Sequence, residues 1–234
     1  KGVFCLNFEE SVAQDITSAY LVNYKASFKD TGKCISAYNN NRFMELASWT
    51  KMNPVAQSTY TGAHVDYGKH GDFTITTQWD GFEKELKDHQ VYQTVHLPAG
   101  TYKFTAVYDT EYEGESSGCY LVATLGNSFP LTSELSTTAL AYAAMQPKSS
   151  TISENSVTFS VREAADVSLG ILANMSGEQC MAISSFSLQK MPITIIEGVP
   201  EGITAPTTVG NKSGKKYTID GRRITRPISG QPYI

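Results

Sequence analysis

Two alternating runs joined by a short turn, between His89 and Tyr108, constrain the fold more than any other part of this chain of 234 residues. In the second run, apolar side chains occupy every second position: Tyr102, Phe104, Ala106 and Tyr108. A period of two with one apolar face is typical of a half-buried antiparallel strand. Between the runs, Pro98 presets φ for a tight turn, and Gly100 supplies the left-handed conformation that ends it. We therefore expect a β-hairpin here and an all-β antiparallel sandwich overall.

Similar short runs recur along the chain. Further strands are expected at 73–79, 120–125 and 182–188, with a second strand pair within 156–173. We expect the sandwich to cover residues 1–191, and the pattern leaves the place of residues 1–42 open.

The composition changes after this region. Prolines and glycines punctuate residues 192–214, which is typical of a linker. In residues 215–234, Asp220 and Gly221 fit a two-residue type I′ turn, which predicts a small C-terminal β-hairpin tail.

Composition narrows the classes of function. The formal net charge is −4. A nucleic-acid binder needs a basic face, so we expect no nucleic-acid partner. No apolar run is long enough to cross a membrane, so no membrane span is expected. Residues 2–6 are too short for the apolar core of a signal peptide, so we expect either the mature form of an exported protein or a trimmed form of it. Many Tyr, Ser and Thr side chains suit contact with uncharged, hydroxyl-bearing ligands, although Tyr and Thr also simply favour strands.

The sequence contains four cysteines: Cys5, Cys34, Cys119 and Cys180. Their even number permits two disulfides with three connectivities, and buried thiols are the alternative. Their spacing does not match a zinc site, which needs close pairs of ligands.

The first candidate for ligand contact is a polar, aromatic segment interpreted as a loop over residues 60–72. It contains Tyr60, His64, Asp66, Tyr67 and His70. Aromatic faces bind the C–H side of a sugar ring while fixed polar groups recognise its hydroxyls, so we expect these residues to bind carbohydrate. An ordinary solvated loop is the alternative. His64, Asp66 and His70 could also ligate a metal, but their spacing matches no strong motif.

Two further segments are candidates. Trp79 precedes the Asp80–Gly81 turn and is either a binding platform at one end of the sandwich or a core residue. An acidic loop follows the second strand of the predicted hairpin. It contains Tyr112, a further carbohydrate candidate, together with Glu111, Glu113 and Glu115. These carboxylates either bind a structural calcium ion or are simply solvated.

No catalytic motif is present. The chain lacks a Gly-x-Ser-x-Gly elbow, a phosphate loop and a His-Glu-x-x-His motif. A carboxylate pair suited to glycoside hydrolysis depends on a distance that sequence does not provide. We therefore expect a protein that is not an enzyme, with a hydrolase as a lesser alternative and with no cofactor beyond the calcium ion considered above.

Three motifs resemble the strands of galactose-binding-domain-like sandwiches. They are the segment Tyr92-Gln93-x-Val95-x-Leu97-Pro98-Ala99-Gly100-Thr101-Tyr102-x-Phe104, the pair Val157-x-Phe159-x-Val161 and Val167-x-Leu169-Gly170-Ile171, and the segment Ile183-Ser184-Ser185-Phe186-Ser187-Leu188. The resemblance covers residues 43–191. It implies a jelly-roll β-sandwich similar to carbohydrate-binding modules, which are common in surface proteins of Gram-negative gut anaerobes.

The tail, residues 217–234, resembles the C-terminal motif of proteins that use the type IX secretion pathway. This resemblance implies export to the cell surface. Together these features predict a non-catalytic, exported module that binds carbohydrate or adheres to glycans. The alternative is a structural or adhesive surface protein that binds protein partners.

Overall fold

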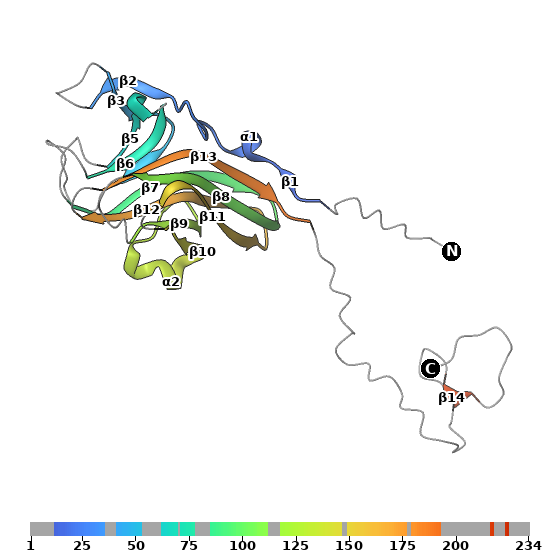
Figure 1. Ribbon diagram of the computed structural model, residues 1–234. Helices are drawn as coiled ribbons and strands as arrows, with labels where there is room; N and C mark the ends of the chain where they lie inside the picture. The colour runs from blue at the N-terminus through green and yellow to red at the C-terminus, as the bar shows by residue number, and fades with distance from the viewer. Residues whose placement is uncertain are drawn as a thin grey trace. The chain divides into compact units, whose positions relative to one another are not determined.

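The structure is a computed structural model, and it describes most of the first 192 residues and two short strands near the C-terminus (Figure 1). The described ranges are 12–35, 41–52, 62–69, 71–77, 85–111, 118–146, 149–176, 179–192, 216–217 and 223–224. The chain forms two units, Lys1–Thr194 and Ile195–Ile234.

The first unit is an antiparallel β-sandwich, as predicted. Within the described residues, sheet A has eight strands in the order β11-β8-β13-β6-β5-β3-β2, with β1 paired to β13. These strands are β1 (Gln14–Asp15), β2 (Asp30–Cys34), β3 (Phe43–Leu46), β5 (Gly62–Asp66), β6 (Asp72–Thr76), β8 (Gly100–Glu111), β11 (Ser149–Val161) and β13 (Cys180–Lys190).

Sheet B has five strands in the order β10-β9-β12-β7-β4. They are β4 (Thr50–Met52), β7 (Glu85–Leu97), β9 (Tyr120–Leu125), β10 (Ala139–Ala144) and β12 (Ala165–Ser176). The short helices are α1 (Thr17–Tyr20), η1 (Tyr67–Lys69), η2 (Thr132–Glu134) and α2 (Leu135–Thr138). None of the helices in the described ranges has the length and apolar character needed to cross a bilayer.

The predicted hairpin around Pro98 is wrong, although both of its strands exist. β7 pairs with β12 and β4 in sheet B, whereas β8 pairs with β11 and β13 in sheet A. The turn therefore carries the chain from one sheet to the other, and the Tyr102 hydroxyl fixes it by donating to the Pro98 carbonyl at 2.7 Å. The predicted strand pair within 156–173 is divided in the same way, between β11 and β12. Alternation identifies the face that each strand buries but not the strand beside it.

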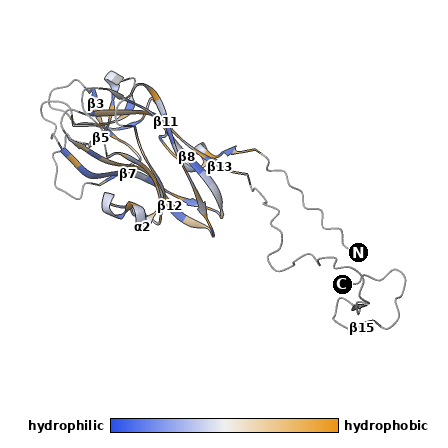
Figure 2. Ribbon diagram, turned by 60° about the horizontal axis from the view of Figure 1, so that its bottom comes forward, coloured by the Kyte–Doolittle hydropathy of each residue, from blue (hydrophilic) through white to orange (hydrophobic). Residues whose placement is uncertain are grey.

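The core lies between the sheets and is rich in aromatic residues. The alternating side chains of β8, from Tyr102 to Tyr108, are at most 1% exposed. Phe186 is central, because the Phe104 ring stacks on it at 5.7 Å and the Trp49 ring lies 4.7 Å away. Figure 2 shows the corresponding mixture of hydrophobic and hydrophilic residues along the strands. Cys119 is also fully buried here as a free thiol, and burial raises its pKa to about 12.

Residues 12–35 belong to the sandwich, a point that the sequence left open. Gln14 pairs with Lys190, and Lys25 forms a bridge with Ser185. In the second unit, β14 (Lys216–Tyr217) pairs antiparallel with β15 (Arg223–Ile224), and the predicted Asp220–Gly221 turn lies outside the described residues.

A strap formed by residues 126–138 packs on part of the outer face of sheet B, around Tyr92, Val122 and Leu172. Phe129 stacks on Tyr92 with ring centroids 4.9 Å apart. The Gln90 side chain donates to the Phe129 carbonyl at 2.8 Å, and the Asp88 carboxylate accepts the Thr132 N–H at 2.8 Å. Figure 1 shows α2, which is part of this strap, beside β9 and β10. Stacking at Phe129 and hydrogen bonds at Phe129 and Thr132 therefore fasten the strap to the sheet.

Candidate functional site

The segment predicted to be a ligand-binding loop is mostly a strand. Residues 62–66 form β5, every residue of which is buried, and η1 follows directly. Ala63 and Val65 face the core, so His64 and Asp66 alternate to the opposite face of sheet A. The sequence did not reveal this strand, because its two core residues, Ala63 and Val65, are small or β-branched and alternate only weakly with their polar neighbours. Tyr60 and His70 lie outside the described residues.

His64 is completely buried on this face of the sheet. Its Nδ1 lies 3.0 Å from the Gly62 carbonyl oxygen, and the Phe43 ring meets its ring edge-on at 5.3 Å. Burial lowers the pKa of His64 to about 4, so the ring is neutral near pH 7. A neutral ring with no exposed surface supports neighbouring elements and does not touch a surface ligand.

Asp66 is also fully buried, and it fixes an arginine. Arg42 donates to both carboxylate oxygens, from Nε at 2.8 Å and from Nη2 at 3.1 Å. The Gly68 N–H donates to the same carboxylate at 2.8 Å. A side chain on residue 68 would not fit, because an added Cβ would lie 2.2 Å from Arg42 Nε. The Arg42 guanidinium, which keeps 37% of its side chain exposed, is therefore held in one orientation over the Phe43 ring.

Tyr67 is the predicted site residue that reaches the surface, with 44% of its area exposed. Its N–H donates to the Arg42 carbonyl at 2.9 Å, and its hydroxyl donates to the Asp30 carboxylate. Asp30 also accepts the Gly32 N–H at 2.6 Å. These hydrogen bonds, first the one from Tyr67, lower the pKa of Asp30, whereas the Asp30 carboxylate raises the pKa of Tyr67. The exposed ring is thus anchored at its backbone and at its hydroxyl.

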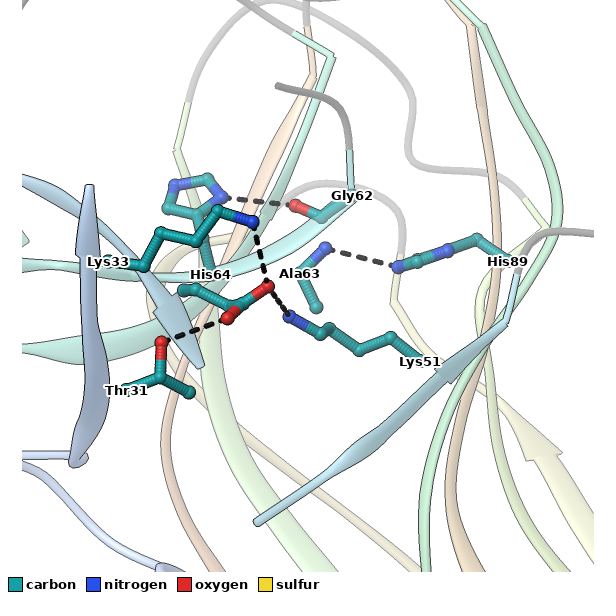
Figure 3. Close-up of polar contacts among 8 residues, drawn as sticks. Thr31, Lys33, Lys51, Gly62, Ala63, His64 and His89 are labelled. Atoms are coloured by element: carbon teal, nitrogen blue, oxygen red, sulfur yellow. Dashed lines mark hydrogen bonds and ion pairs between the residues drawn. The ribbon is translucent and has the colours of Figure 1, made fainter. Parts of the chain in front are cut away.

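Three polar side chains of β2 and β4, which Figure 3 labels, lie close to the Glu45 carboxylate: Thr31, Lys33 and Lys51. Thr31 donates to this carboxylate at 2.9 Å, and the ammonium groups of Lys33 and Lys51 lie 3.6 and 3.9 Å from it. The Thr31 hydrogen bond is the largest cause that lowers the pKa of Glu45. Lys51 comes from sheet B, and its partial burial lowers its pKa. This carboxylate therefore links the two sheets at their edge.

His89 makes a second link between the sheets, from β7 to β5 (Figure 3). β3 pairs with β5 only at Phe43 and Met44. Beyond this stretch, the Ala63 N–H donates to His89 Nε2 at 3.1 Å. Gly62 has a φ of +104° and no room for a side chain, because an added Cβ would lie 2.7 Å from His89 Nε2. Burial lowers the pKa of His89 to about 4.

We name the exposed part of this region the Tyr67 patch, comprising Asp30, Thr31, Lys33, Arg42, Glu45 and Tyr67. Of the residues that the sequence predicted for carbohydrate binding, the structure brings together His64, Asp66 and Tyr67, and it exposes Tyr67. Trp79 and Tyr112 lie outside the described residues. The sequence did not indicate Arg42 or Asp30, because they lie 24 residues from Asp66 and 37 residues from Tyr67 in the chain.

The structure adds little on the predicted ion sites. Glu111 ends β8, and only its backbone is described, while Glu113 and Glu115 lie outside the described residues. In the described part of the chain, no three histidine, cysteine, aspartate or glutamate side chains converge as metal ligands. Asp66, one of the metal ligands considered from the sequence, is instead engaged by Arg42.

The pairing of Arg42 with Asp66 predicts an asymmetric effect of mutation. Arg42→Met leaves a fully buried carboxylate without its cation, which should lower the free energy of unfolding by about 3 kcal/mol. Asp66→Asn leaves a partly exposed guanidinium that water can solvate, so we expect a smaller loss of about 2 kcal/mol. Urea denaturation measures both values. Asp166→Asn is the control, because its pair with His96 is exposed and should contribute under about 1 kcal/mol. An equal or smaller loss for Arg42→Met would contradict this account.

Residues 22–170 match the family described as a domain of unknown function, DUF5013, and the chain belongs to this family. A search of curated proteins gave no match.

Solved structures that resemble the chain include sugar-binding proteins. A putative sugar-binding protein from Bacteroides thetaiotaomicron has 13% identity and a TM-score of 0.46, with 73% of this chain and 100% of that chain covered. The CBM22-1 xylan-binding domain of Xyn10C from Paenibacillus barcinonensis has 9% identity and a TM-score of 0.43, with 75% and 96% covered. A module solved with β-1,4-galactotriose, TmCBM61, has 10% identity and a TM-score of 0.43, with 62% and 89% covered. These values are too low to transfer a ligand or a site to this chain.

Proposed function

We propose that this protein is a non-catalytic module that binds carbohydrate through the Tyr67 patch. The observation that carries this proposal is an exposed tyrosine ring whose position is fixed on both sides. The Arg42 carbonyl holds its backbone, and the Asp30 carboxylate holds its hydroxyl. The sequence resemblance to galactose-binding-domain-like sandwiches implies the same function.

The chemistry of the patch suits a sugar. The face of the Tyr67 ring can cover the C–H side of a pyranose ring, and the surrounding polar groups can exchange hydrogen bonds with its hydroxyls. The hydrogen bonds and ion pairs that hold Arg42 and Glu45 already exist without ligand, so these groups lose little conformational freedom on binding. An exposed patch with one aromatic ring should bind a single sugar unit weakly. On a polymer, several such contacts made together would raise the overall affinity by avidity.

Two other surfaces are less suited to a polymer. The part of the outer face of sheet B around Tyr92 is covered by the strap, which the Phe129 ring and the Gln90 and Asp88 hydrogen bonds hold in place. On the outer face of sheet A, His64 and its partner on the next strand, Thr74, are both fully buried. The Tyr67 patch, by contrast, combines an exposed ring with ordered charged groups.

Affinity electrophoresis of the intact chain through gels that contain soluble polysaccharides tests this proposal. We expect retardation by at least one neutral polysaccharide, relative to a gel without polymer. Unaltered mobility in every gel of a broad panel would refute carbohydrate binding. Capture of a protein partner in that case would favour the adhesive alternative. The long edge strand β11 of sheet A offers a surface for such a partner, and its Ile152 is 75% exposed.

We also propose that the protein is exported and held at the cell surface. The similarity of residues 217–234 to type IX secretion motifs supports this proposal, and β14 and β15 pair in that segment. Fusion of residues 192–234 to a periplasmic reporter, in a host with that pathway, should bring the reporter to the surface. A reporter that stays in the periplasm would contradict the assignment.

A further inference from the structure

The cations in and beside the Tyr67 patch lie close to carboxylates, whereas one carboxylate of the patch, Asp30, has no cation within 4 Å among the described residues. Arg42 is bound to both oxygens of Asp66. Lys33 and Lys51 both lie within 4 Å of one Glu45 oxygen. The two cations of the patch, Arg42 and Lys33, therefore each lie within 4 Å of a carboxylate, and Lys33 shares the Glu45 carboxylate with the neighbouring Lys51. A ligand anion would have to compete with these carboxylates.

Asp30 differs from the other carboxylates. Its hydrogen-bond partners are neutral, the Tyr67 hydroxyl and the Gly32 N–H. In the described part of the chain, Asp30 forms no ion pair within 4 Å. Asp30 is only half-buried, and its carboxylate accepts the Tyr67 hydroxyl, so its negative charge lies beside the Tyr67 ring and within reach of solvent. A ligand stacked on this ring would lie within a few ångströms of that charge.

We propose that Asp30 makes the Tyr67 patch select uncharged glycans over glycans that carry carboxylates or sulfates. This inference rests on the proposed function and names its ligand class. A sugar hydroxyl can donate to the Asp30 carboxylate, whereas a uronate or sulfate at the same place is repelled. Two exposed like charges about 5 Å apart in bulk water repel each other by roughly 1 kcal/mol, which corresponds to about a fivefold weaker affinity. The repulsion is exposed, so salt should screen it.

Matched polymers isolate this effect. Chemical reduction converts the uronate of polygalacturonate or alginate to the neutral sugar and leaves the linkage unchanged. Affinity electrophoresis of the intact chain in each acidic polymer, its reduced form and neutral xylan and galactan gives the ratio of affinities. We expect the wild-type chain to bind the reduced forms about fivefold more tightly, and 0.5 M NaCl should narrow this difference.

Asp30→Asn is the decisive variant, because its side-chain oxygen can still accept the Tyr67 hydroxyl while the charge is gone. The affinity of this variant for the reduced polymer serves as its own reference, and the ratio of affinities for the reduced and acidic forms should come close to one. Asp166→Asn removes another exposed carboxylate, on β12 in the other sheet, and should leave the ratio unchanged. Preference of the wild-type chain for an acidic polymer, or an unchanged ratio in Asp30→Asn, would overturn the selection by Asp30. Failure to bind any polymer, neutral or acidic, would instead overturn the proposed function, and this inference with it.

Discussion

Tyr67→Ala is expected to weaken carbohydrate binding by at least about 20-fold, because the ring is the exposed aromatic surface of the proposed site. Truncation removes the face that covers the sugar ring, and it also frees the Asp30 carboxylate from the hydroxyl that orients it. The free energy of unfolding should change by less than about 1 kcal/mol, because an exposed side chain contributes little to the core. Isothermal titration with an oligosaccharide of the retained polymer measures the affinity, and urea denaturation measures the stability.

The chain offers a matched control for this variant. Tyr142 is also 44% exposed, but it lies on β10 in sheet B and meets the Tyr120 ring edge-on. Tyr142→Ala should therefore leave the affinity unchanged. Tyr67→Phe separates the two roles of Tyr67, because it keeps the ring and removes the hydroxyl, and it should retain most of the binding. A loss of binding in Tyr142→Ala with none in Tyr67→Ala would move the site to sheet B.

Acid is expected to destabilise the sandwich well before its carboxylates are protonated. Burial lowers the pKa of both His64 and His89 from an ordinary 6.5 to about 4. Between these values the unfolded chain binds protons that the folded chain does not, so stability falls as the pH decreases from 6.5 to 4 and is fully retained above 6.5. The shift corresponds to a loss of about 3 kcal/mol in the free energy of unfolding for each ring. The loss is greatest when both rings titrate. Asp15, Asp30 and Glu45, whose pKa values are lowered, add their losses as the pH falls through the ordinary values of 3.8 for Asp and 4.5 for Glu.

His89→Gln tests the contribution of one of the two rings without removing the link between the sheets. A glutamine oxygen can accept the Ala63 N–H that His89 Nε2 now accepts, but it does not titrate. Urea denaturation at pH 7, 5.5 and 4.5 should show a shallower decline for this variant than for the wild-type chain. His96→Gln is the control, because that ring is 68% exposed and its substitution should leave the decline unaltered. Identical declines in the wild-type chain and His89→Gln would show that burial of His89 does not govern the acid response.

Much of the fold could be predicted from the alternation of the strands. The face of β8 from Tyr102 to Tyr108 and the core position of Phe186 follow from residue pattern alone. The partner of each strand could not be predicted, because a strand that buries one face shows the same period whether its neighbour in sequence lies beside it or across the core. The turn at Pro98 illustrates this limit, since it joins two sheets and not two paired strands.

The candidate site was predicted only in part. Clustering of aromatic and polar residues in the sequence indicated Tyr67, but it could not separate an exposed ring from the buried His64 and Asp66. That separation depends on which face of β5 each residue occupies. The partners that fix the ring, Asp30 and Arg42, come from strands and connections distant in sequence, and no local motif marks them.

A glycan-array screen of the intact chain, with Tyr67→Ala in parallel and each sample repeated with a chelator, tests the central claim most directly. Hydrogen bonds join the side chains of the patch to one another and to Asp66, so we predict retention on uncharged glycans that survives chelation and disappears in Tyr67→Ala. Silence of the wild-type chain on a broad array, or equal retention of Tyr67→Ala, would contradict carbohydrate binding at the Tyr67 patch.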